Sequence, residues 1–186
     1  MSRILVAFAS HYGQTRKIAE RLADHLREEG HQVDLADLRS ATHPTVLADY
    51  DVVVVGSRVE TGRHAKEMNA FVRGNHHRLR DLPTALFSVS MSAAKPESGD
   101  DPNGYLASSC KELDWQPSIR HAFAGGLPYR TYGWFTRWMM KSITKKSHGP
   151  TDTSQNHELT NWTDVRLFAN QIAALCPRRV RVLPHG

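Results

Sequence analysis

One stretch near the start of the chain constrains the fold more than any other. Residues 4–16 read ILVAFASHYGQTR, in which an unbroken apolar run ends at a polar turn and a helical pattern follows at once. An apolar run of this length without alternation is typical of a strand buried on both faces, and such strands belong to parallel sheets. The stretch therefore predicts a strand, a turn and a helix in direct succession.

The turn at residues 10–15 has the chemistry of an anion site. Gly13 can adopt a positive φ angle or let the backbone pass close to a ligand. Ser10, Gln14 and Thr15 offer polar side chains beside the unpaired N–H groups of a helix start, where the helix dipole favours an anion. Many turns of this composition only cap a helix, so the residues of the turn leave both interpretations open.

Two better-known phosphate signatures are absent from this stretch. The chain has no G-x-x-x-x-G-K-[ST] sequence, and no G-x-G-x-x-G follows the first predicted strand. A nucleoside triphosphate or a dinucleotide is therefore a weaker prediction for this turn than a single phosphate group.

Hydrophobic patterning predicts four further strands, at residues 33–38, 52–55, 85–89 and 119–124. Helical spacing of apolar residues predicts helices around residues 18–26, 68–72, 106–113 and 162–175. Gly30 is placed to end the first helix, Thr160 to cap the last one and Pro177 to stop it. Five strands alternating with helices predict an α/β fold with a doubly wound, five-stranded parallel sheet.

Ligands of such sheets bind beyond the carboxyl ends of the strands. Three predicted loops share that edge, at residues 10–15, 57–64 and 88–95. We expect the first loop to hold a phosphate group and the other two to hold a flat ring between them.

The composition is that of an ordinary globular chain with a basic bias. The 186 residues suit one domain, which we place at residues 1–176 with a flexible tail at 177–186. The formal net charge is +5, and basic residues become denser after position 119. This bias favours an anionic partner, such as a membrane surface, a nucleic acid or an acidic small molecule.

The two cysteines, Cys110 and Cys176, have no metal-ligand spacing, and no metal site is predicted. The chain begins with Met1 and enters a strand directly, so we expect no signal peptide and two reduced thiols. No apolar run is long enough to span a bilayer, which predicts a soluble or peripheral protein.

A long basic and aromatic insertion, at about residues 126–157, separates the fifth strand from the last helix and is far longer than an ordinary connection. On a helical wheel, one broad arc collects large apolar side chains: Trp134, Phe135, Trp138, Met139, Met140 and Ile143. The narrow remaining face carries Arg137, Lys141 and Lys145, and Arg130 precedes the helix.

Three interpretations of the insertion remain open. Aromatic rings beside a cationic stripe are typical of a helix that lies on an anionic membrane. The same composition suits an anionic planar substrate, and it would also arise if the arc simply packed on the domain. Nucleic acid is not predicted as a partner, because the basic residues cluster with large aliphatic side chains and no nucleic-acid motif is present.

Several motifs in order along the chain resemble one known family. They are SHYGQTRKIA at 10–19, ALFSVS at 85–90 with AKPE at 94–97, DWQP at 114–117, the insertion, TDT at 151–153 and TNW at 160–162. Together they resemble the bacterial flavodoxin-like, quinone-dependent protoporphyrinogen IX dehydrogenases (oxidases), over about residues 3–175.

This resemblance implies a fold, a reaction and a set of site residues. The fold is flavodoxin-like, with strand order 2-1-3-4-5, for which flavodoxin itself is the standard example. The reaction is the oxidation of protoporphyrinogen IX to protoporphyrin IX in haem biosynthesis, with FMN as cofactor and a membrane quinone as electron acceptor. A cytoplasmic protein at the inner membrane, in contact with its anionic surface, follows from the same resemblance.

Cofactor contacts are carried over to the residues that match the family's motifs: Ser10, His11, Tyr12, Gly13, Gln14, Thr15, Ser88, Val89, Ser90, Met91 and Asp152. Substrate or membrane contacts are expected from the insertion, at Arg130, Trp134, Arg137, Trp138, Lys141 and Lys145. No catalytic acid or base is assigned, because His64 and His121 are candidates only by residue type.

Two alternative functions share the predicted fold. One is an electron-carrier flavodoxin, although such carriers are typically acidic and this chain is basic. The other is an NAD(P)H:quinone reductase, which turnover of NAD(P)H would reveal. Neither the oligomeric state nor the kind of quinone follows from the sequence.

Overall fold

The computed structural model describes residues 1–40, 47–91, 93, 101, 104–127 and 157–177. Its centre is a sheet in which five parallel strands lie in the order β2-β1-β3-β5-β6. The strands are β1 (Arg3–Ala9), β2 (Gln32–Asp37), β3 (Val52–Glu60), β5 (Thr84–Ser90) and β6 (Ile119–Ala124). When the five parallel strands are numbered in chain order without the short strand at residues 63–64, this is the order 2-1-3-4-5. The predicted flavodoxin-like order is therefore confirmed.

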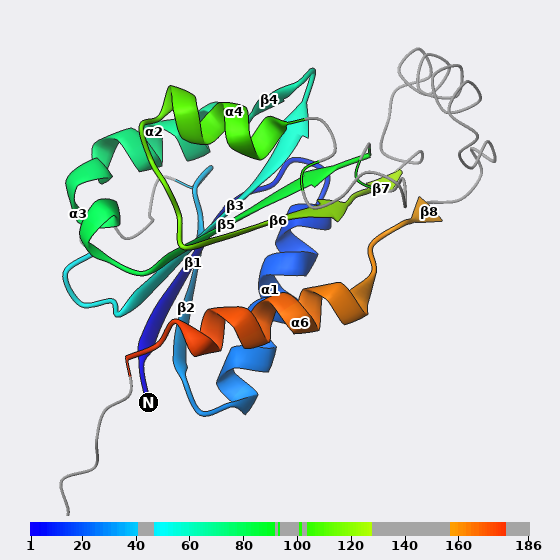
Figure 1. Ribbon diagram of the computed structural model, residues 1–186. Helices are drawn as coiled ribbons and strands as arrows, with labels where there is room; N and C mark the ends of the chain where they lie inside the picture. Colours follow the sequence, from blue (N-terminus) through cyan, green and yellow to red (C-terminus); the bar gives the residue numbers. More distant parts are fainter. Residues whose placement is uncertain (41–46, 92, 94–100, 102–103, 128–156, 178–186) are drawn as a thin grey trace, which may run out of the picture.

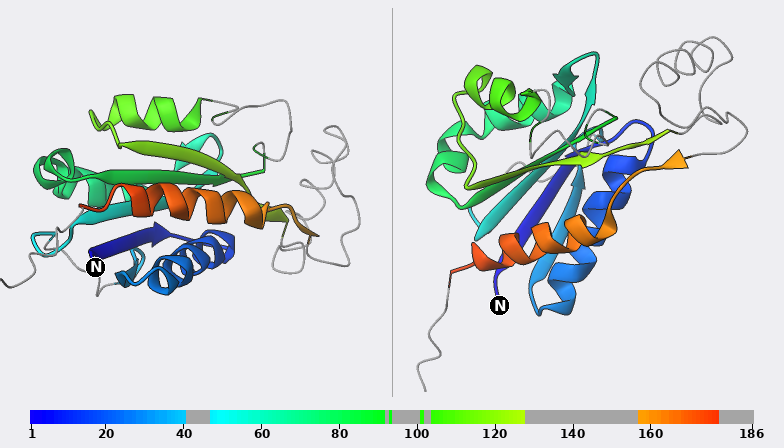
Figure 2. Two further views of the ribbon diagram at one scale, coloured as in Figure 1. Left: turned by 60° about the horizontal axis from the view of Figure 1, so that its bottom comes forward. Right: turned by 45° about the vertical axis from the view of Figure 1, so that its right-hand side comes forward.

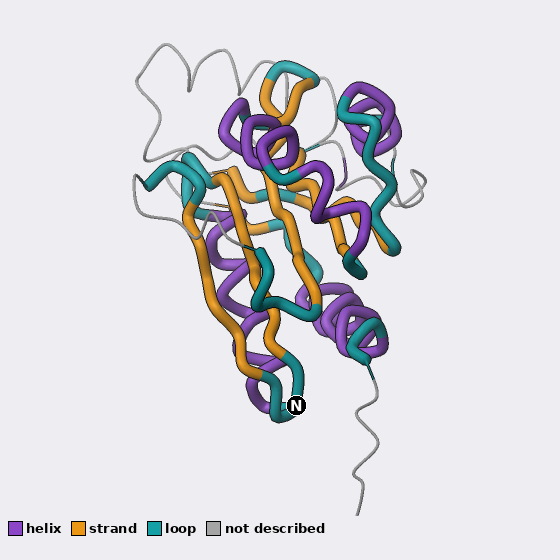
Figure 3. Tube along the Cα trace, turned by 90° about the vertical axis from the view of Figure 1, so that its left-hand side faces the viewer, coloured by secondary structure: helices purple, strands orange, loops and turns teal. Residues whose placement is uncertain are grey.

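Helices cover both faces of this sheet. They are α1 (Gln14–Glu28), α2 (Lys66–Gly74), α3 (His76–Asp81), α4 (Tyr105–Glu112) and α6 (Trp162–Ala174). Figure 1 shows α1 and α6 on one face and α2, α3 and α4 on the other, and the further views in Figure 2 and Figure 3 show the same layers.

Each face buries its own hydrophobic cluster. On one face, Ile18 and Leu22 of α1 meet Val165 and Phe168 of α6 over alternate residues of the strands. On the other face, Met68 and residues of α3 and α4 pack on the intervening strand residues. All seven residues of β5 are buried, whereas only Val33 and Ala36 of the edge strand β2 are buried.

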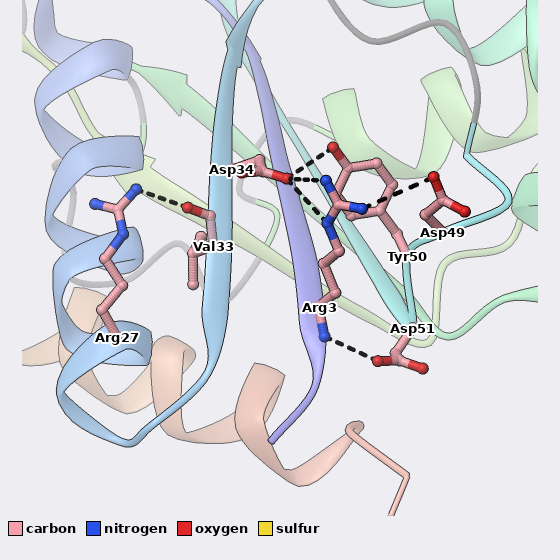
Figure 4. A network of polar contacts seen from close by, with 7 residues as sticks. All are labelled: Arg3, Arg27, Val33, Asp34, Asp49, Tyr50 and Asp51. Atoms are coloured by element: carbon pink, nitrogen blue, oxygen red, sulfur yellow. Dashed lines mark hydrogen bonds and ion pairs between the residues drawn. The ribbon is translucent and has the colours of Figure 1, made fainter.

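A polar network fixes the amino ends of β1 and β2 (Figure 4). Arg3 donates to Asp34 at 3.1 and 3.2 Å, and Tyr50 donates to the same carboxylate at 3.0 Å. Burial, followed by the hydrogen bond to Asp34, raises the pKa of Tyr50. A cavity of about 450 Å³ beside Tyr50 and Asp51 also lies at this end of the molecule, opposite the edge where ligands of such sheets bind.

Several predicted element boundaries are wrong. Thr160 does not cap α6, because the side chain of Asn161 is the group that accepts from Thr163 N–H, at 3.0 Å. Residues 58–64 are not a simple loop: β3 continues to Glu60 and pairs with the short antiparallel strand β4 (Arg63–His64). The polar helix α3 has no predicted counterpart, because only Leu79 of its six residues is buried.

A second, two-stranded sheet lies beyond the end of β6. It consists of β7 (Gly126–Leu127) and β8 (His157–Glu158), which pair antiparallel at the two ends of the long insertion. Figure 1 shows this small sheet at the same edge as the carboxyl ends of the central strands.

Candidate functional site

The register of the sheet brings three connections to one level. Ala9 at the end of β1 pairs with Ser57 of β3, and Ser57 pairs with Ser88 of β5. The chain segments that follow these strands therefore start from the same edge, which we call the carboxyl edge. The first of them is the turn at residues 10–13 that leads into α1.

The turn before α1 has the backbone geometry of an anion site. Gly13 stands at the helix start with φ 93°, and its N–H donates to Ser10 Oγ at 3.2 Å. The first helical hydrogen bond runs from Lys17 N–H to Gly13 O at 3.0 Å, so the N–H groups of Thr15 and Arg16 precede the helical ladder. Of the two roles considered for Gly13 from the sequence, the positive φ angle is observed.

Two arginines near the turn have different partners. Arg16 is paired with Asp37 at 2.6 Å and lies over the ring of Phe8, so much of its charge is balanced. Arg39, which follows β2, donates from Nη1 to the carbonyl O of Ser10 at 2.8 Å. No sequence pattern places Arg39 at this turn, because the contact joins segments that only the parallel pairing of β1 and β2 brings together.

Other predicted residues of the turn differ in exposure. Ser10 and Thr15 are buried, whereas His11 is exposed and Tyr12 has an exposed fraction of 38%. The rings of His11 and Tyr12 meet edge to face, with centroids 4.5 Å apart. The turn therefore presents an aromatic pair on its outer side and backbone donors at the helix start.

The connection after β3 is a tight hairpin rather than an open loop. Thr61 and Gly62 both have positive φ angles, 49° and 79°, as in the two-residue turns that suit twisted antiparallel strands. A β-branched residue rarely adopts a positive φ, and residues held in this way cluster at functional sites. Ser57 Oγ fixes the base of the hairpin by accepting from Ala65 N–H at 3.0 Å.

The connection after β5 begins later than predicted. Ser88, Val89 and Ser90 are buried within the strand, because β5 continues to pair with β6 up to Ser90 and Ala124. Ser90 Oγ accepts from Ala93 N–H at 3.3 Å, and Met91 is the first residue outside the strand. Of these four predicted cofactor residues, Ser90 and Met91 stand at the carboxyl edge itself.

Both histidines considered as an acid or base lie within strands rather than in loops. His121 lies within β6, with its ring 4.5 Å from that of Phe123 and 5.6 Å from that of Phe168. His64 in β4 is only 8% exposed, and neither ring nitrogen has a well-aligned hydrogen-bond partner among the described residues. Burial lowers the pKa of His64, although the nearby backbone of Tyr105 and the charges of Asp101 and Glu112 oppose this shift.

The lowered pKa of His64 predicts a loss of stability in acid. The folded state keeps the ring neutral, whereas the unfolded chain takes up a proton near the ordinary pKa of 6.5. The contribution of His64 is complete above that pH and is lost as the pH falls below it. We expect urea unfolding of His64→Leu to depend less on pH between about 7 and 5 than the wild type.

The matched control for this measurement is His77→Gln, because the His77 side chain is 97% exposed. An unchanged pH profile in His64→Leu, or an equally flattened profile in His77→Gln, would contradict the assignment.

Seven predicted site residues lie outside the described residues: Arg130, Trp134, Arg137, Trp138, Lys141, Lys145 and Asp152. Among the residues that the structure does describe, no group of three or more His, Cys, Asp or Glu side chains could hold a metal ion. Within the same residues, no helix is both long and apolar enough to cross a membrane.

The donors at the turn fit a single phosphate group. They combine N–H groups at the start of a long helix with the Thr15 side chain and a neighbouring guanidinium, and no acidic residue stands in the first turn of α1. The hairpin after β3 and the segment after β5 stand at the same edge, where a ring attached to such a phosphate could lie. The described residues thus fit FMN, which carries one phosphate and one flat ring system.

A doubly wound sheet in this order, with a turn that fits an anion after its first strand, is typical of the flavodoxin-like class of proteins. The family model for the flavodoxin domain matches residues 5–154. The flavodoxin of Streptococcus pneumonia TIGR4 superposes with a TM-score of 0.51 at 16% identity, over 93% of this chain and 99% of that one.

Similarity in sequence is closer to particular enzymes. Protoporphyrinogen IX dehydrogenase [quinone] of Escherichia coli K12 is 36% identical over 174 residues, which cover 93% of this chain and 96% of that protein. The enzyme of the same name from Leishmania major is 30% identical, over 93% of this chain and 75% of that one. This chain belongs to the quinone-dependent protoporphyrinogen IX dehydrogenase family, as the motifs in its sequence imply.

Proposed function

We propose that this protein is an FMN-dependent dehydrogenase that oxidises protoporphyrinogen IX to protoporphyrin IX and passes the electrons to a quinone. The observation that carries the proposal is 36% identity, over nearly the full length of both chains, to an enzyme named for this substrate and acceptor. The turn before α1 supports it, because its donors fit the phosphate of FMN.

FMN, when bound, supplies the two-electron redox chemistry that amino-acid side chains lack. The protein's part is to bind and orient it. We assign the phosphate to the turn from Ser10 to Thr15, with Arg39 beside it, and the ring to the space bordered by Thr61, Gly62 and Met91. All the individual cofactor contacts expected from the sequence stay predictions, including those at His11, Tyr12, Ser88, Val89, Ser90 and Asp152.

The substrate carries propionate groups, which suit cationic side chains. We assign their recognition to the basic residues of the insertion, with Arg130 and Arg137 as the first candidates. The complete reaction removes six electrons and six protons from each substrate molecule, so three quinone molecules must each accept two electrons and two protons. We also propose that residues 1–176 act as a single domain that carries this whole reaction.

We further propose that the protein is cytoplasmic and binds the anionic surface of the inner membrane, where the quinone resides. The support is the cationic stripe of Arg137, Lys141 and Lys145 beside two tryptophans. The fraction of protein that sediments together with vesicles containing anionic lipid should fall as the salt concentration rises. If replacing all three cations by glutamate leaves this binding intact, the membrane assignment is wrong.

An anaerobic assay tests the proposed function directly. The FMN-loaded protein is mixed with protoporphyrinogen IX and a soluble quinone, and porphyrin fluorescence is followed against a flavin-free control. We expect porphyrin to form only with both FMN and quinone present. FMN binding without porphyrin formation would overturn the proposal in favour of an electron carrier, and equally fast turnover of NAD(P)H would favour a quinone reductase.

A further inference from the structure

Two hydrogen bonds join three segments that are far apart in the sequence at the carboxyl edge. The side-chain amide of Gln14 donates to Thr160 Oγ1 at 2.8 Å, and the Thr160 hydroxyl donates to the carbonyl O of Ala124 at 2.7 Å. Thr160 is only 8% exposed, so water competes weakly for these bonds. The hydroxyl acts as donor and acceptor at once, which no apolar side chain of the same shape can do.

The two hydrogen bonds of Thr160, which we call the bridge, lie between the turn before α1 and the two ends of the insertion. Gln14 is the first residue of α1, directly after the turn that fits a phosphate. Ala124 ends β6 just before β7, and Thr160 stands between β8 and the cap of α6. The bridge therefore links the phosphate-binding turn to the point where the chain leaves for the insertion and returns from it.

We propose that Thr160 is a positioning residue for the phosphate-binding turn. By holding the Gln14 side chain against the end of β6, it fixes the start of α1 and with it the direction of the first helical N–H groups. A turn fixed in advance loses less conformational freedom when the phosphate binds, so FMN binds more tightly. This inference rests on the proposed function, because it takes FMN as the ligand of the turn.

The test compares two ligands that differ only in the phosphate. The affinities of the flavin-free wild type, Thr160→Val and Thr160→Ser for FMN and for riboflavin are measured by quenching of flavin fluorescence. We expect Thr160→Val to weaken FMN binding roughly threefold to tenfold, the range of one net hydrogen bond, and to leave riboflavin binding within about twofold. Thr160→Ser, which keeps the hydroxyl, should restore FMN affinity.

A double-mutant cycle identifies Gln14 as the partner. If Thr160 acts through Gln14, then Gln14→Met should weaken FMN binding by itself, and adding Thr160→Val should cost little more. The matched control is Thr84→Val, which removes the hydroxyl of a buried threonine at the amino end of β5, away from the turn. Thr84→Val should lower stability without changing the ratio of FMN to riboflavin affinity.

The outcomes separate this inference from the proposed function. Tight FMN binding by the wild type together with unchanged FMN binding by Thr160→Val overturns the inference alone. Equal losses for FMN and riboflavin also overturn it, because they indicate general destabilisation. Failure of the wild type to bind FMN at all overturns the proposed function.

Discussion

Replacing Gly13 by aspartate is expected to weaken FMN binding at least about 100-fold. The substituted carboxylate would stand where the phosphate is expected, and two like charges about 4 Å apart near a protein surface repel by several kcal/mol. The site has room for the side chain, because a Cβ at Gly13 meets nothing within 4 Å among the described residues. Any side chain is strained at φ 93°, but aspartate is among the residues that tolerate a positive φ and it is favoured by the helix dipole, so the flavin-free protein should remain folded with lower stability.

Two controls isolate the effect of charge. Gly13→Asn has nearly the same shape and the same positive φ, 93°, but no charge, so it should retain most of the affinity that Gly13→Asp loses. Gly30→Asp places the same residue at φ 86°, also with open space, at the far end of α1. Gly30→Asp should leave the affinity for FMN unchanged. If Gly13→Asp and Gly13→Asn bind FMN with equal affinity, the assignment of the phosphate to this turn is wrong.

The first strand, its turn and the first helix could be predicted from sequence because local patterns specify them. Ile4 to Ala9 is apolar without alternation, and the structure buries every one of these residues. Gly13 is the residue type that a positive φ favours, and the helix after it shows its apolar face at regular spacing. Each of these signals is complete within a few residues of chain.

The hairpin at Thr61 and Gly62 could not be predicted in the same way. Threonine strongly prefers extended backbone, so the residue type carries no signal for φ 49°. The pairing of Val59 with His64 imposes that angle from outside the turn. The sequence signal was also weak at the cap of α6, where Thr160 and Asn161 are both good capping residues and only the geometry shows which one accepts from Thr163.

Contacts between distant segments account for the site residues that sequence reasoning missed. Arg39 reaches Ser10 only because β1 and β2 pair in parallel, and Gln14 meets Thr160 across 146 residues. No local pattern encodes either contact. A candidate binding turn can therefore be proposed from its own residues, whereas the residues that support it follow from the topology of the sheet.

Strands β3 and β5 approach closely at Gly56, in the middle of the sheet. We therefore expect Gly56→Ala to lower the free energy of unfolding by about 3 kcal/mol. Gly56 pairs with Phe87 on the neighbouring strand, and a Cβ at Gly56 would overlap the Phe87 ring. That ring is fully buried and packs edge to face on Phe123, with centroids 5.8 Å apart, so it has little room to move. Urea unfolding of the flavin-free protein measures the loss, since bound ligand would add its own stabilisation.

If overlap with the Phe87 ring causes this loss, removing the ring should reduce the cost of Gly56→Ala. Phe87→Leu should be destabilising by itself, but in that background Gly56→Ala should cost less than about 1 kcal/mol, because the overlapping ring is gone. Gly74→Ala serves as the control for adding a methyl group, since nothing lies within 4 Å of its Cβ, and it should not be destabilising. If the costs of Gly56→Ala and Phe87→Leu simply add, the ring of Phe87 is not what excludes a side chain at position 56, and the close contact between β3 and β5 has another cause.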